Sequence, residues 1–288
     1  MVTSQTTPTR PGLLSRRLVL VVGFGTLAIV VTAVVGGIWS ALLSLNLATS
    51  PAVPWAVVVM APLLWLLWRY LGGAGWPRGT AEARRHYLRA RRMPGQVFLW
   101  AVGAGLLAIV ALAGLWIVLF QLAHLPARAL PDYSKYPLVT VALALVMASL
   151  VGAVTEEAMF RGYFQGILEG PVGAVAAILI TALVMAPEHA QTQGFVWPTL
   201  LFYLVVDVML GATAFLTQSI LPGIVTHGIG LLVFFTLVWP GDVIRRVAGS
   251  GTTEQWFWLH SAQTLVFAVL ATLAFIHLAR ISKRPQGV

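Results

Sequence analysis

The length of its uncharged segments is the feature that most constrains what this chain can fold into. The run from Leu18 to about Leu43 contains no charged side chain, and a helix of about 20 apolar residues is enough to cross a bilayer. Only 9% of the 288 residues are charged, compared with roughly 25% in a typical soluble domain. A water-soluble chain of this size would need far more polar surface. The sequence therefore predicts an integral membrane protein.

Apolar runs separated by proline, glycine or charge predict an all-α, polytopic membrane bundle of about eight transmembrane helices. The predicted spans lie near residues 18–43, 53–70, 97–122, 138–168, 172–190, 195–217, 219–239 and 256–279. The chain shows no internal repeat and no appended soluble domain. We therefore expect one transmembrane domain over residues 18–280, with a cytoplasmic N-terminal segment at 1–17 and a cytoplasmic tail at 281–288.

The basic residues are distributed unevenly between the two sides of this predicted bundle. One side carries 13 of them: Arg10, Arg16, Arg17, Arg69, Arg78, Arg84, Arg85, Arg89, Arg91, Arg92, Arg280, Lys283 and Arg284. The other side carries four: Arg128, Lys135, Arg245 and Arg246. Because basic loops stay in the cytoplasm, we expect both termini there, in a bacterial plasma membrane. The net charge of +9 then reflects topology, and we expect no nucleic-acid partner.

A few ionisable residues are predicted to lie inside the membrane, where each costs several kcal/mol and therefore indicates function. They are Glu156, Glu157, Arg161, Glu188, His189, Asp207 and His227. In a helix, Glu157 and Arg161 lie four residues apart on one face, and their pairing lowers the cost of burying both charges. Glu156 lies about 100° round the helix and is left available as a general base or acid.

Two histidines are predicted to lie near Glu156. The fourth and fifth spans form a predicted hairpin with its turn near Gly170–Pro171. Glu156 precedes the turn by 14 residues and His189 follows it by 18, so both lie roughly 21–27 Å from it at about 1.5 Å per residue. His227 lies on the seventh span among small residues that permit close helix approach. We expect these three side chains to form one site, although either histidine alone would more simply be a packing residue.

Four further ionisable residues lie in or near the predicted spans: Asp207, Glu188, His260 and His277. Asp207 would either orient a histidine or pair with Arg161. The direction of Glu188, which follows a proline, is not predicted. His260 and His277 lie near the ends of the last span and are expected at the membrane interface.

The order Glu-Glu-x-x-x-Arg on one helix, a His about 30 residues later and a second His about 40 beyond it, resembles the Abi family. This is the CPBP group of intramembrane proteases, to which the type II CAAX prenyl endopeptidases belong. The match runs from about Thr155 to Val233, and the tract Thr155–Tyr163 is its most specific part. The resemblance implies a catalytic core at about 138–240 and hydrolysis of a peptide bond in a membrane-associated protein or peptide. The expected partners are this substrate and the lipid bilayer; no oligomeric state is predicted.

The resemblance also implies a role for each matched residue. Glu156 would activate a water molecule, His189 would orient that water, and His227 would help to stabilise the oxyanion. Glu157 and Arg161 would hold the geometry of the site. The family implies no metal and no other cofactor, although two imidazoles and a carboxylate would also suit zinc.

Two positions depart from the family pattern. Met185 replaces an aromatic residue four positions before His189, and Leu231 replaces the Asn or Asp expected four positions after His227. An apolar side chain cannot donate a hydrogen bond to an oxyanion, and such a donor is worth on the order of 3 kcal/mol. The alternative function is therefore a catalytically degenerate scaffold or chaperone that binds partner transmembrane segments. A proton-coupled transporter is a third hypothesis.

Overall fold

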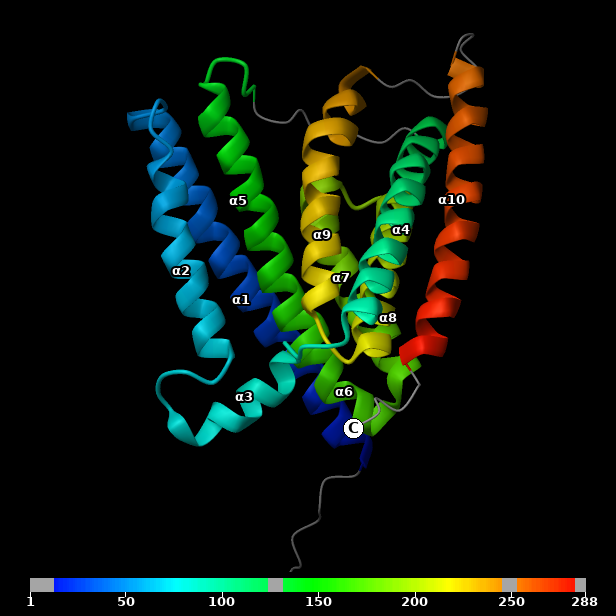
Figure 1. The fold of residues 1–288 in the computed structure, drawn as a ribbon. Coiled ribbons are helices and arrows are strands. Elements are labelled where there is room, and N and C mark those ends of the chain that lie inside the picture. Colours follow the sequence, from blue (N-terminus) through cyan, green and yellow to red (C-terminus); the bar gives the residue numbers. More distant parts are fainter. Residues whose placement is uncertain (1–12, 124–131, 245–252, 283–288) are drawn as a thin grey trace, which may run out of the picture.

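The computed structural model describes residues 13–123, 132–244 and 253–282, and every regular element in these ranges is a helix. The long helices are α1 (Leu13–Thr49), α2 (Trp55–Leu71), α4 (Gly95–Leu122), α5 (Leu138–Glu156), α7 (Ala174–Gln193), α8 (Trp197–Thr217), α9 (Leu221–Val233) and α10 (Thr253–Ser282) (Figure 1). Short segments between them are η1 (Arg78–Thr80), α3 (Ala81–Leu88), η2 (Glu157–Phe164), α6 (Gln165–Val172), η3 (Phe234–Val238) and η4 (Trp239–Ile244). The predicted all-α class is confirmed for this part of the chain, whereas most of the predicted segments 1–17 and 281–288 lie outside the described residues.

Six segments of the described chain are long and apolar enough to cross a membrane. They are Leu18–Thr49, Gly95–Leu122, Leu138–Val172, Trp197–Thr217, Leu221–Asp242 and Glu254–Ser282. The spans predicted near 53–70 and 172–190 correspond to the shorter apolar helices Trp55–Leu71 and Ala174–His189. α2 has 17 residues, fewer than the 20 or so that cross a bilayer without tilt or thinning, and α7 becomes polar toward its end. The count of eight spans is therefore not confirmed.

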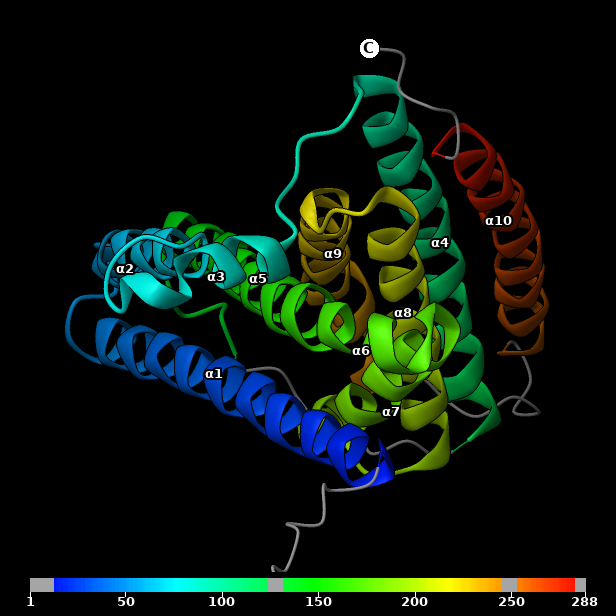
Figure 2. The same cartoon turned by 90° about the horizontal axis from the view of Figure 1, so that it is seen from below.

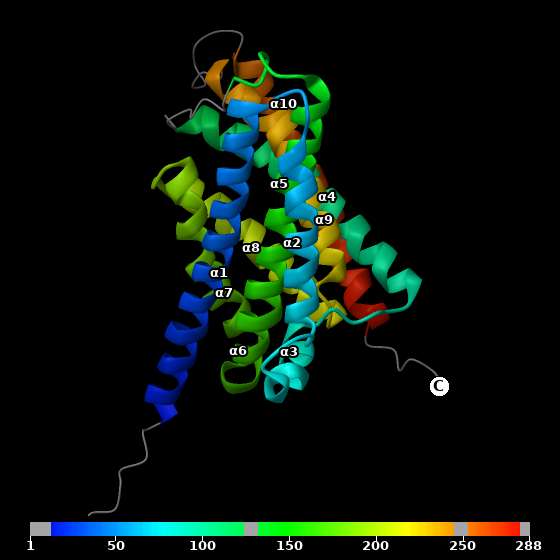
Figure 3. The ribbon, with the colours of Figure 1, turned by 90° about the vertical axis from the view of Figure 1, so that its left-hand side faces the viewer.

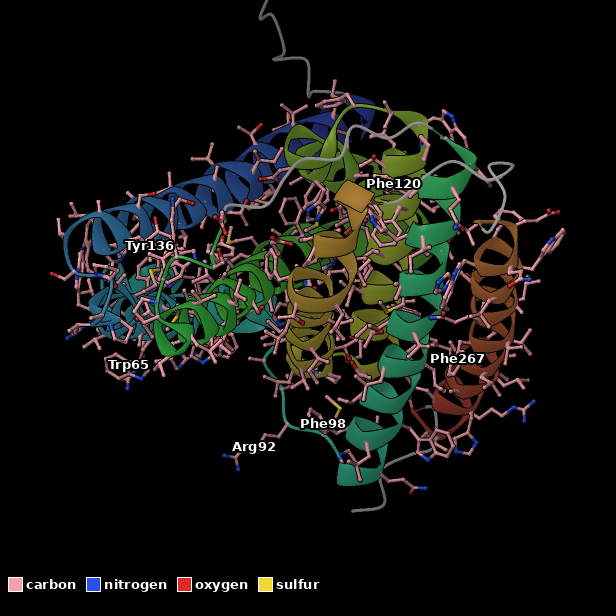
Figure 4. The ribbon with its side chains drawn as sticks, turned by 90° about the horizontal axis from the view of Figure 1, so that it is seen from above. Trp65, Arg92, Phe98, Phe120, Tyr136 and Phe267 are labelled. Atoms are coloured by element: carbon pink, nitrogen blue, oxygen red, sulfur yellow. The ribbon has the colours of Figure 1, made fainter. Side chains whose placement is uncertain are left out.

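Large apolar side chains cover the outside of the bundle. On α5, Leu143, Val146 and Leu150 are between 40% and 42% exposed and recur every three or four residues, so they form one outward face. On α2, Trp65 is 56% exposed and points away from the other helices (Figure 4). An apolar surface of this extent is suited to lipid and not to water. The protein is an integral membrane protein.

The helices form two groups that meet at α5. α1 and α2 pack beside α5, while α4, α8, α9 and α10 lie on the other side (Figures 1 and 2). α5 packs against α9, α7 packs against α8, and α10 packs along α4. α5, α7 and α9 therefore bring the acidic residues and the histidines that they carry toward the middle of the bundle.

The helix that carries the Glu-Glu motif runs without interruption from Leu138 to Val172. The turn predicted near Gly170–Pro171 lies two residues further on, because Pro171 is within α6 and α6 ends before Gly173. Gly173 has a φ of +84°, which glycine adopts without steric cost. Residues 157–164 form a π-helix, with wider turns than an α-helix. This segment begins directly after Glu156.

The end of the bundle that carries α3 is closed by close packing. α3 and α6 lie together at this end (Figure 3). A Cβ atom at Gly162 would lie 3.0 Å from two backbone carbonyl oxygens at the end of α3, so the absence of a side chain there permits this approach. Arg89 donates two hydrogen bonds to Glu169, at 2.8 and 2.9 Å. Arg84 and Arg89 are each 7% exposed, so these two arginines are structural and not solvated loop residues.

Candidate active site

Glu156 is the last residue of α5, and its carboxylate faces the centre of the bundle. Its side chain is 20% exposed. The Oε2 atom is buried and has no hydrogen-bond partner among the described residues. A buried carboxylate oxygen without a partner costs free energy, and such a group in a native structure indicates a function or an unplaced water.

Two histidine rings lie on either side of this oxygen. His189 Nε2 of α7 is 3.7 Å from Glu156 Oε2, and His227 Nε2 of α9 is 3.6 Å from the same atom. Both separations are slightly longer than a direct hydrogen bond. The structure thus brings together Glu156 and His189, which the hairpin spacing placed at similar depth, and adds His227 from a third helix.

The ring of His227 is oriented by Glu157. His227 Nδ1 lies 3.1 Å from Glu157 Oε1, and an ionised carboxylate can only accept, so the hydrogen bond requires the proton on Nδ1. Nε2 then faces Glu156 and the space beyond it. Glu157 is 0% exposed, so this contact lies inside the bundle.

The ring of His189 is held by an aromatic neighbour. It stacks on Tyr203 of α8 with ring centroids 4.3 Å apart and planes inclined by 16°. Tyr203 is itself packed edge-on against Phe202 and Trp116. Stacking of this kind restricts rotation of the imidazole, so Nε2 keeps its position beside Glu156.

Arg161 is the centre of a fully buried ion cluster. Its Nη1 lies 3.4 Å from Glu157 Oε1, and its Nη2 donates to Asp207 Oδ1. Nη1 also lies 3.0 Å from the sulfur of Met185. Of the two roles considered for Asp207, the structure supports the pairing with Arg161. Arg161 offsets part of the carboxylate charge inside the bundle and fixes Glu157, which in turn orients His227.

A cavity of about 580 Å³ adjoins Glu156, His189 and His227. Its wall is mostly apolar and is built from α1, α4, α5, α8, α9 and the segments after α9. Aromatic side chains on it are Trp39, Tyr133, Phe202, Tyr203, Phe234, Phe235 and Trp239. The three polar side chains are thus exposed to a common internal space in which a substrate and a water molecule could meet a base.

The sequence of this region matches a known family. Residues 137–233 match the family model described as type II CAAX prenyl endopeptidase Rce1-like. The chain carries an Rce1-like segment. The resemblance to the CPBP proteases is therefore confirmed, and it supports a membrane peptidase. No curated protein and no solved structure matches the chain.

The Rce1-like segment extends from the residue before α5 to the last residue of α9. It therefore includes Glu156, His189 and His227 together with the ion cluster. α1 and α4, which lie outside it, contribute to the cavity wall and to packing. The site geometry and the family match thus point to the same part of the chain.

The two departures from the family pattern have different surroundings. Met185 is 1% exposed and lies against the Arg161 guanidinium, a contact that an aromatic ring could also make. Leu231 lines the cavity. A Cβ atom on Gly152 would lie 2.9 Å from Leu231 Cδ1 and 3.6 Å from Glu156 Oε1. Leu231 therefore lies close to the proposed base but offers no hydrogen-bond donor.

The other ionisable residues considered in the sequence have partners of their own. Glu188 Oε1 accepts a hydrogen bond from Thr32 of α1 at 3.2 Å. His277 packs against Trp100, and His260 Nδ1 lies 2.9 Å from Gln263 Oε1. Among the described residues, no group of three or more His, Asp or Glu side chains is arranged to hold a metal ion.

Tyr203 is a site residue that the sequence reasoning missed. It lies four residues before Asp207 on α8, so both side chains lie on one face of that helix. Because Asp207 was predicted to be buried beside the charged cluster, the same spacing could have placed Tyr203 there. The π-helical geometry of η2 had no comparable signal in the sequence.

Proposed function

We propose that this protein is an intramembrane endopeptidase that hydrolyses a peptide bond of a membrane-associated protein or peptide. Glu156 is the general base that takes a proton from water, and His189 orients that water. His227 stabilises the oxyanion, and Glu157 with Arg161 hold the site. One observation carries the proposal: the unpartnered Oε2 of Glu156 lies within 3.7 Å of two imidazole nitrogens and beside a cavity.

In the proposed reaction the water lies between Glu156 and His189. Glu156 removes one proton as the water oxygen attacks the carbonyl carbon, and the proton then passes to the leaving amine. When His227 is protonated at both nitrogens, Nδ1–H donates to Glu157 and Nε2–H points toward the developing oxyanion. A donor aimed at this oxygen in a site with little water is strongly stabilising. The proposed reaction uses no metal ion.

The membrane topology is also a proposal. The arginine-bearing end with α3 faces the cytoplasm, α2 and α7 cross a locally thinned bilayer, and the total is eight spans. The first described residues of α1 and the last of α10 lie at the same end as α3, which agrees with both termini in the cytoplasm (Figure 1). The transmembrane domain then covers 18–280, flanked by the cytoplasmic segments 1–17 and 281–288, in a bacterial plasma membrane.

Replacement of the base tests the function. Glu156→Gln keeps the shape of the side chain but removes the base, and we expect the cleavage rate to fall about 10³-fold. Membrane proteomes of cells with wild-type protein and with Glu156→Gln should differ in a protein whose cleavage disappears. A chelator applied to the wild-type protein is the control for metal dependence. Unchanged cleavage by Glu156→Gln at equal protein level would contradict the proposal.

A scaffold or chaperone is the second candidate, and Leu231 is the observation that favours it. An apolar side chain in place of a polar one makes the cavity wall beside Glu156 better suited to binding than to catalysis. A scaffold keeps its cellular phenotype in the Glu156→Gln variant, and a peptidase loses it. The same variant therefore separates the two functions.

A further inference from the structure

As far as the described residues show, the cavity extends from the site toward one end of the bundle. Its lining follows α5 from Glu156 back to Val141 and continues to Tyr133, which precedes the first residue of α5. Trp239 and Asp242 of η4 line it as well. The α5 stretch alone measures roughly 22 Å, at about 1.5 Å per residue. The cavity thus connects Glu156 with the end of the bundle where α5 begins, close to Tyr136 in Figure 4.

On the other side of Glu156 the described chain is tightly packed. Phe160, Arg161, Phe164 and Leu168 are 0% exposed, and none of them lines the cavity. In the same segment, Gly162 lies against the backbone carbonyl groups at the end of α3. The described residues thus leave a path to Glu156 from the end of the bundle opposite α3 and close the end that carries α3.

The length of the cavity suits an extended chain. An extended chain rises about 3.3 Å per residue, so roughly seven residues would cover the roughly 22 Å of α5 that line it. In a helix each carbonyl group is engaged in an internal hydrogen bond, so a scissile carbonyl is open to attack only in an unwound segment.

We propose that the substrate enters from the membrane face opposite α3, as an extended, mainly apolar peptide segment that runs along α5 to Glu156. The substrate class is thus a membrane protein whose scissile segment lies at that face, which is the non-cytoplasmic face in the proposed topology. The statement about substrate rests on the proposed peptidase function. The statement about access rests on the cavity alone.

The complete absence of cysteine allows a direct test with single cysteines. Ala148→Cys on α5 and Val206→Cys on α8 place a thiol on the cavity wall. Val146→Cys and Val205→Cys are matched controls, because these neighbours are each 41% exposed on the outside of the bundle. Ser134→Cys and Arg85→Cys mark the two ends. A charged, membrane-impermeant methanethiosulfonate reagent is applied to vesicles that hold the protein in each of the two orientations. The labelling rate of each cysteine is measured from the mass increase of the protein by mass spectrometry.

Both cavity cysteines should react at least tenfold faster from the Ser134→Cys side than from the Arg85→Cys side. The controls facing lipid should react from neither side. Faster labelling of the cavity cysteines from the Arg85→Cys side, or rates as low as the lipid-facing controls from both sides, would overturn the proposal. Using two wall positions on different helices protects the result against one variant that fails to fold.

The access test and the function test can fail separately. Labelling is repeated in the Glu156→Gln background, where the same sidedness is expected because access does not need the base. If Glu156→Gln still cleaves while the sidedness holds, the peptidase function fails and the entry path stands. If cleavage is lost but the sidedness reverses, the function stands and the entry path fails.

Discussion

The ion cluster of Glu157, Arg161 and Asp207 and the cavity cluster of Glu156, His189 and His227 are neighbours, yet they satisfy their charges differently. In the ion cluster every member is at most 2% exposed, and the guanidinium contacts both carboxylates. In the cavity cluster the side chain of Glu156 is 20% exposed, and its Oε2 atom has no hydrogen-bond partner among the described residues. The ion cluster is therefore a fixed structural group, whereas Glu156 can bind a water molecule or a substrate.

The comparison shows how a membrane protein can keep a reactive carboxylate in a low-dielectric environment. Burying a charge is costly unless it is paired, so the pairing is concentrated one residue further along the chain, at Glu157. The contact between Glu157 and His227 links the two clusters. The paired charges therefore orient the ring beside the unpaired one without neutralising Glu156.

Removing the centre of the ion cluster should have the largest effect on stability. Arg161→Met leaves Glu157 and Asp207 buried without their cation, and breaking such a pair costs roughly 3–5 kcal/mol. We expect a correspondingly lower free energy of unfolding in detergent, measured by denaturant titration. Glu156→Gln is the matched control and should unfold like wild type. Equal stability of Arg161→Met and wild type would show that the ion cluster does not hold the bundle.

Restoring a donor in the cavity should have the next largest effect, this time on rate. Leu231→Asn places an amide close to Glu156, and an oxyanion donor is worth on the order of 3 kcal/mol, or roughly 10²-fold in rate. We expect the turnover number to rise by up to that factor. Leu231→Met keeps the volume without the donor and should behave like wild type. A rise in both variants would attribute the effect to packing and not to hydrogen bonding.

Loosening the ring of His189 should have the smallest effect. Tyr203→Leu removes a stacking contact worth about 0.5–1.5 kcal/mol. We expect the turnover number to fall by roughly tenfold, with little change in KM, because a mobile imidazole positions water less often. Tyr203→Phe keeps the stacked ring and should restore the rate. If Tyr203→Leu changed KM alone, Tyr203 would contact substrate and would not position the histidine.

Composition and helix spacing predicted a large part of this picture. The apolar runs predicted the long spans, since a bilayer requires uncharged segments of a given length. Glu156 and His189 lie at similar numbers of residues from the predicted turn of the hairpin. Because the rise per residue is nearly constant in helices, this spacing predicted that the two side chains would lie close to each other. Helix spacing predicted that Arg161 would pair with Glu157 and not with Glu156, because residues four apart share a face.

The remaining features depend on contacts between helices and could not be predicted. Whether Asp207 would reach Arg161 or a histidine depends on how α8 is rotated against η2. The stacking of Tyr203 on His189 depends on the separation of α7 and α8. The closed end depends on α3 packing at Gly162, and no single-helix pattern in the sequence encodes such an approach.

The π-helical segment η2 has a consequence for how this tract can vary. A π-helical stretch holds one residue more than an α-helix with the same number of turns. Deleting one residue between 157 and 164 would therefore restore α-helical turns and leave the helix after it in nearly the same rotation, whereas a deletion within α6 would rotate the residues after it by about 100°. Gln165 would then keep its direction toward the Gly211 carbonyl, and Glu169 would keep its direction toward Arg89. This tract should accept the loss of one residue more readily than the α-helical segments on either side of it.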